Sequence, residues 1–369
     1  MKWDREVVAQ VCNALPYLGP HAFHRLVERL GSDVGRIFSS SEAELVEEFS
    51  LSHRAAASVL SWETHIDLER EYLAMERCGG RFISCLAPDY PQQLRAVDNA
   101  PIGLYVAGRD IANVRSVAIV GSRICTFYGE MLAQNLAKQL VEAGYAVASG
   151  LAKGIDLAAH GGALAANGHT IAVLAGALDS IYPPENAETY HRIRRDGTLA
   201  SEFSFGQRVQ RQNFAIRNRI ITGLSAATVV VESPCNGGSM LSARFARDQK
   251  RPLFAVPGRL SDPRSAGCLK LIREGAHLFT GVEDLFQILD HSPRPAQLQL
   301  DLSQKLQPCP TLEGIELRIW KALARQGRAT AEELAAELDM AVLECAQLLQ
   351  TMRIGGAVTR EPSGEFVPC

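Results

Sequence analysis

The sequence contains no long apolar run. No segment approaches the roughly 20 consecutive apolar residues that a membrane-spanning helix requires. The first residues, MKWDREVVAQ, mix acids and bases instead of forming the apolar stretch of a signal peptide. We therefore expect a cytoplasmic protein without a membrane partner.

Signatures of metal and nucleotide sites are also missing. The nine cysteines form no C-x-x-C pair and follow no regular spacing, which argues against a zinc site or a disulfide framework and favours reduced thiols. Neither the G-x-x-x-x-G-K-[ST] loop of P-loop triphosphatases nor a G-x-G-x-x-G after a strand occurs. We expect no metal and no cofactor.

Acidic residues slightly outnumber basic ones overall, but the middle of the chain carries an excess of positive charge. The net charge is −3, with −5 in residues 1–100, −3 in residues 311–369 and +5 between them. Because charges are screened over about 8 Å, a local basic patch attracts a polyanion even on an acidic protein. Composition alone favours the alternative, a solvated helix face. Seven arginines gather between residues 191 and 219: Arg192, Arg194, Arg195, Arg208, Arg211, Arg217 and Arg219.

From residue 114 onward, short apolar strands alternate with helical segments. Continuous apolar strands separated by helices indicate a parallel sheet covered on both faces. The predicted fold class is α/β, a Rossmann-like doubly wound parallel sheet, in which ligands bind at the carboxyl ends of the strands. Strands are expected at 114–120, 145–149, 170–175, 198–201, 227–232 and 252–256. Helices are expected at 126–142, 154–166, 186–195, 213–223 and 238–249.

Two smaller domains are expected beside this core, which we place at residues 83–290. Residues 1–82 show helical periodicity and predict a small N-terminal helical domain of SAM or helix-hairpin-helix type. Residues 291–310 contain four prolines and predict a linker. Residues 311–369 predict three helices and a hairpin, the pattern of a C-terminal winged-helix-like domain. Because this last domain is acidic, we expect it to contact protein or to be merely architectural, not to bind a polyanion.

The first glycine-containing turn, Gly121-Ser122-Arg123, joins the strand 114–120 to the next helix. Free N–H groups at a helix start make an anion site, and an arginine adds a forked donor suited to phosphate. A tight turn with an exposed arginine explains the residues equally well.

A second turn, SGLAKGID, contributes Lys153. Its Asp156 and His160 suggest a metal or acid–base pair, although Asp156 is more simply a first-turn acid that complements the helix dipole.

The segment NFAIRNRIITGLS places Phe214 among arginines. Bases of single-stranded nucleic acid stack on such a ring, and the stacking tolerates any sequence. An isolated phenylalanine at a helix start would instead pack into the core.

A third turn, VESPCNGGSM, and a fourth, with Gly258, Arg259 and Gly267, follow further strands. Because the carboxyl ends of parallel strands meet at one edge, a chain of phosphates is the ligand that suits these turns best.

Taken together, these segments resemble the DNA-processing protein A family (DprA, also called Smf). The resemblance runs from about Leu86 to Leu289, through VAIVGSR…YG, SGLAKGID…AH, TIAVLAGALDSIYP, LASEF, NFAIRNRIITGLS, VVVESP…GGS and FAVPG…LIREGA. It implies a non-enzymatic protein that binds single-stranded DNA, protects incoming DNA in natural transformation and helps to load the recombinase RecA. It also implies a homodimer formed through the Rossmann-like domains.

The resemblance carries over onto individual residues. Ser122 and Arg123 would hold phosphate, Lys153 would assist by its charge, and Arg211 and Phe214 would supply the basic residue and the base-stacking ring. Pro184-Glu185 departs from the family pattern, which often has a lysine there. The DNA-binding site predicted in full is Gly121, Ser122, Arg123, Lys153, Arg211, Phe214, Arg217, Asn218, Arg219, Gly238 and Ser239, with no catalytic residue.

Two alternatives remain open at this point. A Rossmann-type nucleotide phosphoribohydrolase would need a glutamate where this chain has Ser242, unless Glu202 or Glu232 supplied the proton. A sequence-specific repressor would use the winged helix, but this domain is acidic and has no arginine-rich recognition helix.

Overall fold

The computed structural model describes residues 3–207, 209–290, 312, 314–354, 357–361 and 364–368. The chain divides into two compact units, Met1–Gln297 and Leu298–Cys369. The predicted linker 291–310 and Arg208 lie outside the described residues, so the predicted domain boundaries stay predictions.

Short helices form the beginning of the first unit. Their apolar faces bury Phe23, Leu26, Ile37 and Leu45, and this core continues into one face of the sheet described next. Side chains cap several of these helices, as where Asp67 accepts the Arg70 N–H at 3.1 Å. The helices are α1 (Arg5–Ala14), α2 (Pro20–Leu30), η1 (Gly31–Ser39), η2 (Glu44–Glu48), α3 (His53–Leu60), η3 (Trp62–Thr64) and α4 (Leu68–Cys78).

Nine strands of the described chain form a single sheet, in the order β1-β2-β6-β5-β4-β3-β7-β8-β9. β2 runs antiparallel to β1 and β6, and the other neighbours are parallel. The order reverses between β3 and β7, which places a ligand-binding switch point at their carboxyl ends. The strands are β1 (Gly80–Ser84), β2 (Gly103–Gly108), β3 (Ser116–Val120), β4 (Ala146–Ser149), β5 (Thr170–Val173), β6 (Thr198–Ser201), β7 (Ala227–Val230), β8 (Leu253–Ala255) and β9 (His277–Leu278).

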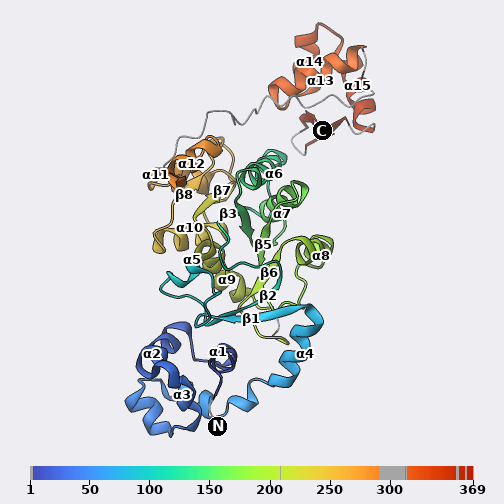
Figure 1. Ribbon diagram of the computed structural model, residues 1–369. Coiled ribbons are helices and arrows are strands. Elements are labelled where there is room, and N and C mark those ends of the chain that lie inside the picture. The colour runs from blue at the N-terminus through green and yellow to red at the C-terminus, as the bar shows by residue number, and fades with distance from the viewer. Residues whose placement is uncertain are drawn as a thin grey trace. The chain divides into compact units, whose positions relative to one another are not determined.

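Helices cover both faces of this sheet, with α6, α7 and α8 on one side and α9 and α10 on the other (Figure 1). This arrangement confirms the doubly wound α/β fold and the strand–helix alternation predicted from residue 114. None of the helices in the described ranges combines the length and apolar character needed to cross a bilayer. The helices are α5 (Gln92–Arg95), α6 (Phe127–Glu142), α7 (Ile155–Ala165), η4 (Pro184–Asn186), α8 (Ala187–Asp196), α9 (Arg211–Leu224), α10 (Ser239–Asp248), α11 (Ala266–Arg273) and α12 (Val282–Asp290).

The antiparallel edge formed by β1 and β2 was not predicted. β1 follows α4 directly, because Gly79 ends that helix in the left-handed conformation, with φ of 60°. Phe82 and Tyr105 face each other across the two strands, with ring centroids 5.0 Å apart. β1 therefore crosses the boundary that we placed between residues 82 and 83.

The second unit has its own apolar core, which includes Trp320, Leu334, Leu349 and Phe366. Three helices and an antiparallel hairpin surround it, as the sequence predicts, while the winged-helix assignment itself stays a prediction. The elements are α13 (Gly314–Gln326), α14 (Ala331–Leu338), α15 (Val342–Ile354), β10 (Val358–Arg360) and β11 (Phe366–Pro368).

Candidate nucleic-acid interface

The turns that follow β3, β4 and β7 contact one another at the switch point. The Ser122 N–H donates to the Glu232 carbonyl at 2.7 Å, and the Ile155 N–H donates to the Ser122 carbonyl at 3.2 Å. These two bonds tie the β3 turn to the β7 turn on one side and to the start of α7 on the other. Three of the glycine-containing turns identified in the sequence therefore lie together.

Two glycines permit this close approach. A Cβ atom at Gly121 would lie 2.5 Å from the Ile155 side chain, and one at Gly154 would lie 2.4 Å from the Ser122 carbonyl oxygen. Gly154 also has a φ of 76°, a conformation that side chains other than glycine rarely adopt. Any larger residue at either position would push the turns apart.

The Glu232 carboxylate of the protein itself lies at the start of α6. Glu232, which is buried, accepts the Thr126 N–H at 2.9 Å and also the Thr126 hydroxyl. Thr126 in turn caps α6 by accepting the Gly129 N–H at 2.9 Å. An internal carboxylate therefore bonds the N-cap residue of α6, while the expectation that an anion meets this turn stays a prediction.

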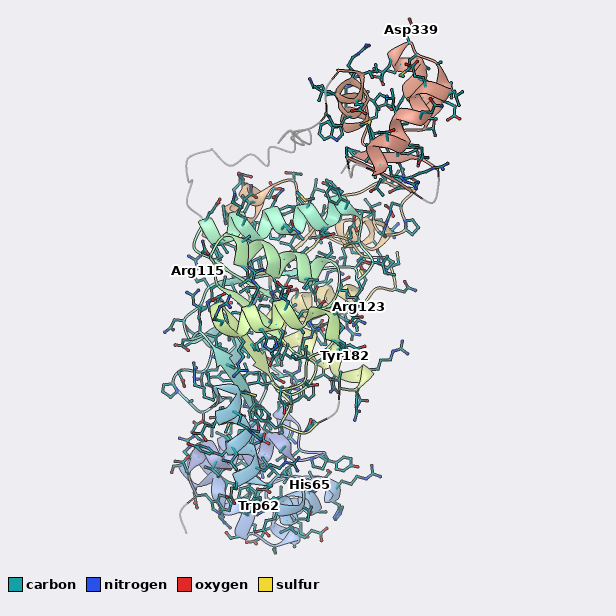
Figure 2. All side chains as sticks on the ribbon, turned by 90° about the vertical axis from the view of Figure 1, so that its right-hand side faces the viewer. Trp62, His65, Arg115, Arg123, Tyr182 and Asp339 are labelled. Atoms are coloured by element: carbon teal, nitrogen blue, oxygen red, sulfur yellow. The ribbon has the colours of Figure 1, made fainter. Side chains whose placement is uncertain are left out.

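A groove of about 980 Å³ opens along this edge of the sheet. We call it the rim groove. Figure 2 shows Arg123 and Tyr182 at the same edge of the core, with Arg115, just before β3, at the opposite edge. Predicted site residues that line the rim groove are Gly121, Ser122, Arg123, Arg211, Phe214, Arg217, Asn218, Gly238 and Ser239.

The Phe214 ring lies close to an arginine and to a tyrosine. The Arg123 guanidinium carbon is 4.9 Å from the ring centroid, and the Tyr182 ring centroid is 5.4 Å from it. Phe214 is half-buried, whereas Arg123 and Tyr182 are exposed. This cluster offers an aromatic surface beside a cation, which suits an unpaired base and its phosphate. Our sequence reasoning missed Tyr182, although an aromatic residue in the turn after β5 was a usable signal.

Helical spacing explains which side chains of α9 reach the rim groove. Arg211, Phe214 and Asn218 stand three and four residues apart and share one face of α9. The Asn218 side chain also donates to the Gly238 carbonyl at 3.4 Å, linking α9 to the turn before α10.

Arg217 is a buried cation in the wall of the rim groove. Its side chain lies 4.0 Å from the Asp156 carboxylate, and its Nε finds no hydrogen-bond acceptor among the described residues. Burial lowers the Arg217 pKa to about 10, with Asp156 opposing the shift, and burial raises the Asp156 pKa against the effect of Arg217. A Cβ atom on Gly150 would lie 1.3 Å from Arg217 Nη1, so the guanidinium occupies the space that a side chain at position 150 would need.

Arg219 was predicted to belong to the DNA-binding site, but the structure places it away from the rim groove. Two residues after Arg217, it points to the other side of α9, since each helical residue turns about 100°. There its buried guanidinium pairs with Glu202 at 2.5 Å and donates to the Asn99 carbonyl at 2.7 Å. Arg219 therefore supports packing and does not line the rim groove.

Lys153 lines a smaller neighbouring pocket of about 260 Å³. Arg123, Tyr182 and Phe214 line both this pocket and the rim groove, so the two are continuous. We call it the Lys153 pocket. Lys153 does not present a free charge there, because its ammonium group pairs with Glu185 at 2.8 Å.

His160 does not form the metal or acid–base pair that its spacing from Asp156 suggested. The Leu151 N–H donates to its Nε2 at 3.3 Å, and its Nδ1 bonds the Thr170 hydroxyl at 2.7 Å. Asp156 instead accepts the Gly150 N–H at 3.2 Å. Over the part of the chain that the structure describes, no group of three or more His, Cys, Asp or Glu side chains is placed to hold a metal ion.

Two histidines whose pKa values are lowered by burial should make the folded protein less stable in acid. Burial lowers the pKa of His160 to about 3 and that of His169 to about 4, both below the ordinary 6.5. The unfolded chain therefore binds more protons, so stability is fully present above pH 6.5 and is lost progressively as the pH falls from 6.5 to about 4 for His169 and to about 3 for His160. We expect each histidine to remove more than about 1 kcal/mol of unfolding free energy per pH unit in that window.

Urea unfolding between pH 7.5 and pH 4.5 measures this effect. His169→Gln, which removes one of the two groups, should make the dependence on pH shallower. A slope identical to that of the wild type would contradict the assignment of His169.

Comparison with known proteins gives a consistent result. The family model described as DNA recombination-mediator protein A matches residues 81–290. Protein Smf of Synechocystis sp. is 33% identical over 319 residues, which cover 78% of this chain and 79% of that protein. DNA processing protein DprA of Bacillus subtilis is 36% identical over 224 residues, covering 60% of this chain and 75% of that protein.

Two solved structures are also similar. The X-ray structure of DNA processing protein A from Streptococcus pneumoniae has a TM-score of 0.68 at 31% identity and covers 79% of this chain and 99% of that chain. A structure of DNA processing protein A from Helicobacter pylori, reported for its single-stranded DNA binding mode, has a TM-score of 0.52 at 29% identity. It covers 57% of this chain and 95% of that chain.

Proposed function

Because this chain belongs to the DNA recombination-mediator protein A family, we propose that it binds single-stranded DNA along the rim groove. Its role would be to protect incoming DNA in the cytoplasm and to help load the recombinase RecA during natural transformation and recombination. It would act as a homodimer formed through the Rossmann-like domain. The RecA and dimer contacts follow from the family resemblance and have no assigned residues.

One observation carries the DNA-binding proposal. The Arg123 guanidinium lies 4.9 Å from the Phe214 ring inside a groove that Arg211 and Arg217 also line. Base stacking on an aromatic ring contributes about 1–3 kcal/mol per base and requires an unstacked base, while arginines neutralise the backbone phosphates. This combination favours single strands over duplex.

Competition between single-stranded and duplex DNA tests the proposal. We expect an oligothymidylate to bind more tightly than a duplex of equal length, with affinity falling steeply between 50 and 200 mM salt because phosphate contacts release counterions. Fluorescence anisotropy across the salt series measures both effects. Equal affinity for the duplex, or no binding of the single strand, would refute the proposal.

The contacts of the acidic residues disfavour the phosphoribohydrolase alternative. Ser242 lines the rim groove where that enzyme class needs a glutamate. Glu232 accepts bonds from Thr126 at the start of α6, and Glu202 pairs with the buried Arg219. Both carboxylates are engaged in the packing of the chain, so neither is available as a proton shuttle. Free base released from nucleoside monophosphates would instead support the enzyme.

A further inference from the structure

An ion pair lies in the lining of the Lys153 pocket. Lys153 Nζ donates to Glu185 Oε1 at 2.8 Å, and both side chains are more than half exposed. Both residues line the pocket together with Arg123 and Phe214. The pair therefore stands within the surface that we propose for the DNA strand.

The fold holds these two residues in place. Lys153 lies in the turn after β4, and Glu185 lies in η4, within the segment that follows β5. Asn186, which is buried, joins the two turns by donating its side-chain N–H to the Leu151 carbonyl at 2.9 Å. Pro184 restricts the backbone immediately before Glu185. The backbones of the two segments are therefore held close enough for the Lys153 and Glu185 side chains to pair.

The pair changes the charge that a DNA strand meets. The hydrogen bond from Lys153 holds the pKa of Glu185 below its ordinary value, so the carboxylate stays ionised at neutral pH. A salt bridge this exposed adds little to folding stability. Its main consequence is electrostatic, because Glu185 cancels the charge of Lys153 and places a negative group where a phosphate would approach.

We propose that Glu185 occupies the place of a DNA phosphate at Lys153 and thereby sets the affinity of the protein for single-stranded DNA. A strand gains the Lys153 contact only by displacing Glu185, and it then remains close to a repelling carboxylate. This inference rests on the proposed function and names a residue that weakens binding within the same site.

The charge of Glu185 can be removed without changing its shape. In Glu185→Gln, Lys153 becomes free to neutralise one phosphate. We expect the affinity for an oligothymidylate to rise about fivefold at 50 mM salt and the slope of log K against log[salt] to steepen by about 0.7, the value for one phosphate contact on a single strand. Fluorescence anisotropy across a salt series gives both quantities.

Three further variants separate the specific contact from net charge. Glu188→Gln makes the same charge change at an exposed position on the first turn of α8, which does not line the pocket, and should alter affinity by less than about 1.5-fold. Lys153→Ala should lower the affinity in the wild-type background, because it leaves the Glu185 carboxylate without its cation beside the strand. It should abolish the gain in the Glu185→Gln background, because the freed ammonium group is then missing.

The affinities and salt slopes of these variants decide whether Glu185 weakens DNA binding through Lys153. The proposal holds if Glu185→Gln tightens binding, steepens the slope and loses both effects with Lys153→Ala. Unchanged affinity and slope in Glu185→Gln overturn it, and so does an equal gain in Glu188→Gln, which would indicate net charge alone. If the wild-type protein fails to bind the oligonucleotide at all, the proposed function falls and this inference falls with it.

Discussion

Gly150→Ala is expected to destabilise the protein by about 3 kcal/mol, the range of core overpacking and of breaking a buried ion pair. The new Cβ atom would lie 1.3 Å from Arg217 Nη1, so the guanidinium must move. Its displacement leaves the Asp156 carboxylate buried without its cation. The same displacement changes the wall of the rim groove, so single-stranded DNA affinity should fall as well.

Gly161→Ala is the matched control for this substitution. Gly161 lies within α7, and a Cβ atom there would meet no atom within 4 Å. Alanine is the better helix former, so we expect this variant to be neutral or slightly more stable. Urea unfolding at pH 7.5 compares the two. An unfolding free energy of Gly150→Ala within 0.5 kcal/mol of the wild type would contradict the packing that we describe around Arg217.

Phe214→Ala should weaken single-stranded DNA binding by roughly 10- to 100-fold, because it removes a stacking surface worth about 1–3 kcal/mol per base. The slope of log K against log[salt] should stay unchanged, since no phosphate contact is lost. Arg123→Ala should also lower the affinity, but with a slope shallower by about 0.7. The two variants thus separate stacking from charge in one titration series.

A cation–π pair elsewhere in the chain provides the control for these variants. Arg54 lies 5.7 Å from the centroid of the Tyr17 ring among the N-terminal helices, away from the rim groove. Arg54→Ala removes the same charge and the same kind of ring contact, and it should leave DNA affinity close to that of the wild type. Wild-type affinity in both Phe214→Ala and Arg123→Ala would remove the basis of the site assignment.

The sequence was most informative where local pattern determines structure. The strands from β3 to β8 are short, continuous apolar runs, because parallel strands covered on both faces bury every side chain. β1 has no such signal, since its first residues are only partly buried and it follows a helix without a break. The glycine-containing turns were recognised for the same local reason, because a glycine after a strand marks a close backbone approach.

Long-range contacts limited the prediction of the site. Glu232 bonds Thr126, which lies 106 residues earlier in the chain, and no local pattern indicates such a contact. Arg217 and Arg219 have the same chemistry in the sequence, but α9 turns one toward the rim groove and the other into the packing against Glu202. Helical spacing within α9 could have separated them, since residues two apart cannot share a face.

The most direct test of the account is photo-crosslinking of the full chain to an oligothymidylate carrying 5-iodouracil, followed by mass spectrometry of the linked peptides. If an unpaired strand lies along the rim groove, the crosslinks will fall on peptides that contain Phe214 or Tyr182, and Phe214→Ala will reduce them. Crosslinks confined to the N-terminal helices or to residues 314–368, with none at the rim groove, would contradict the account.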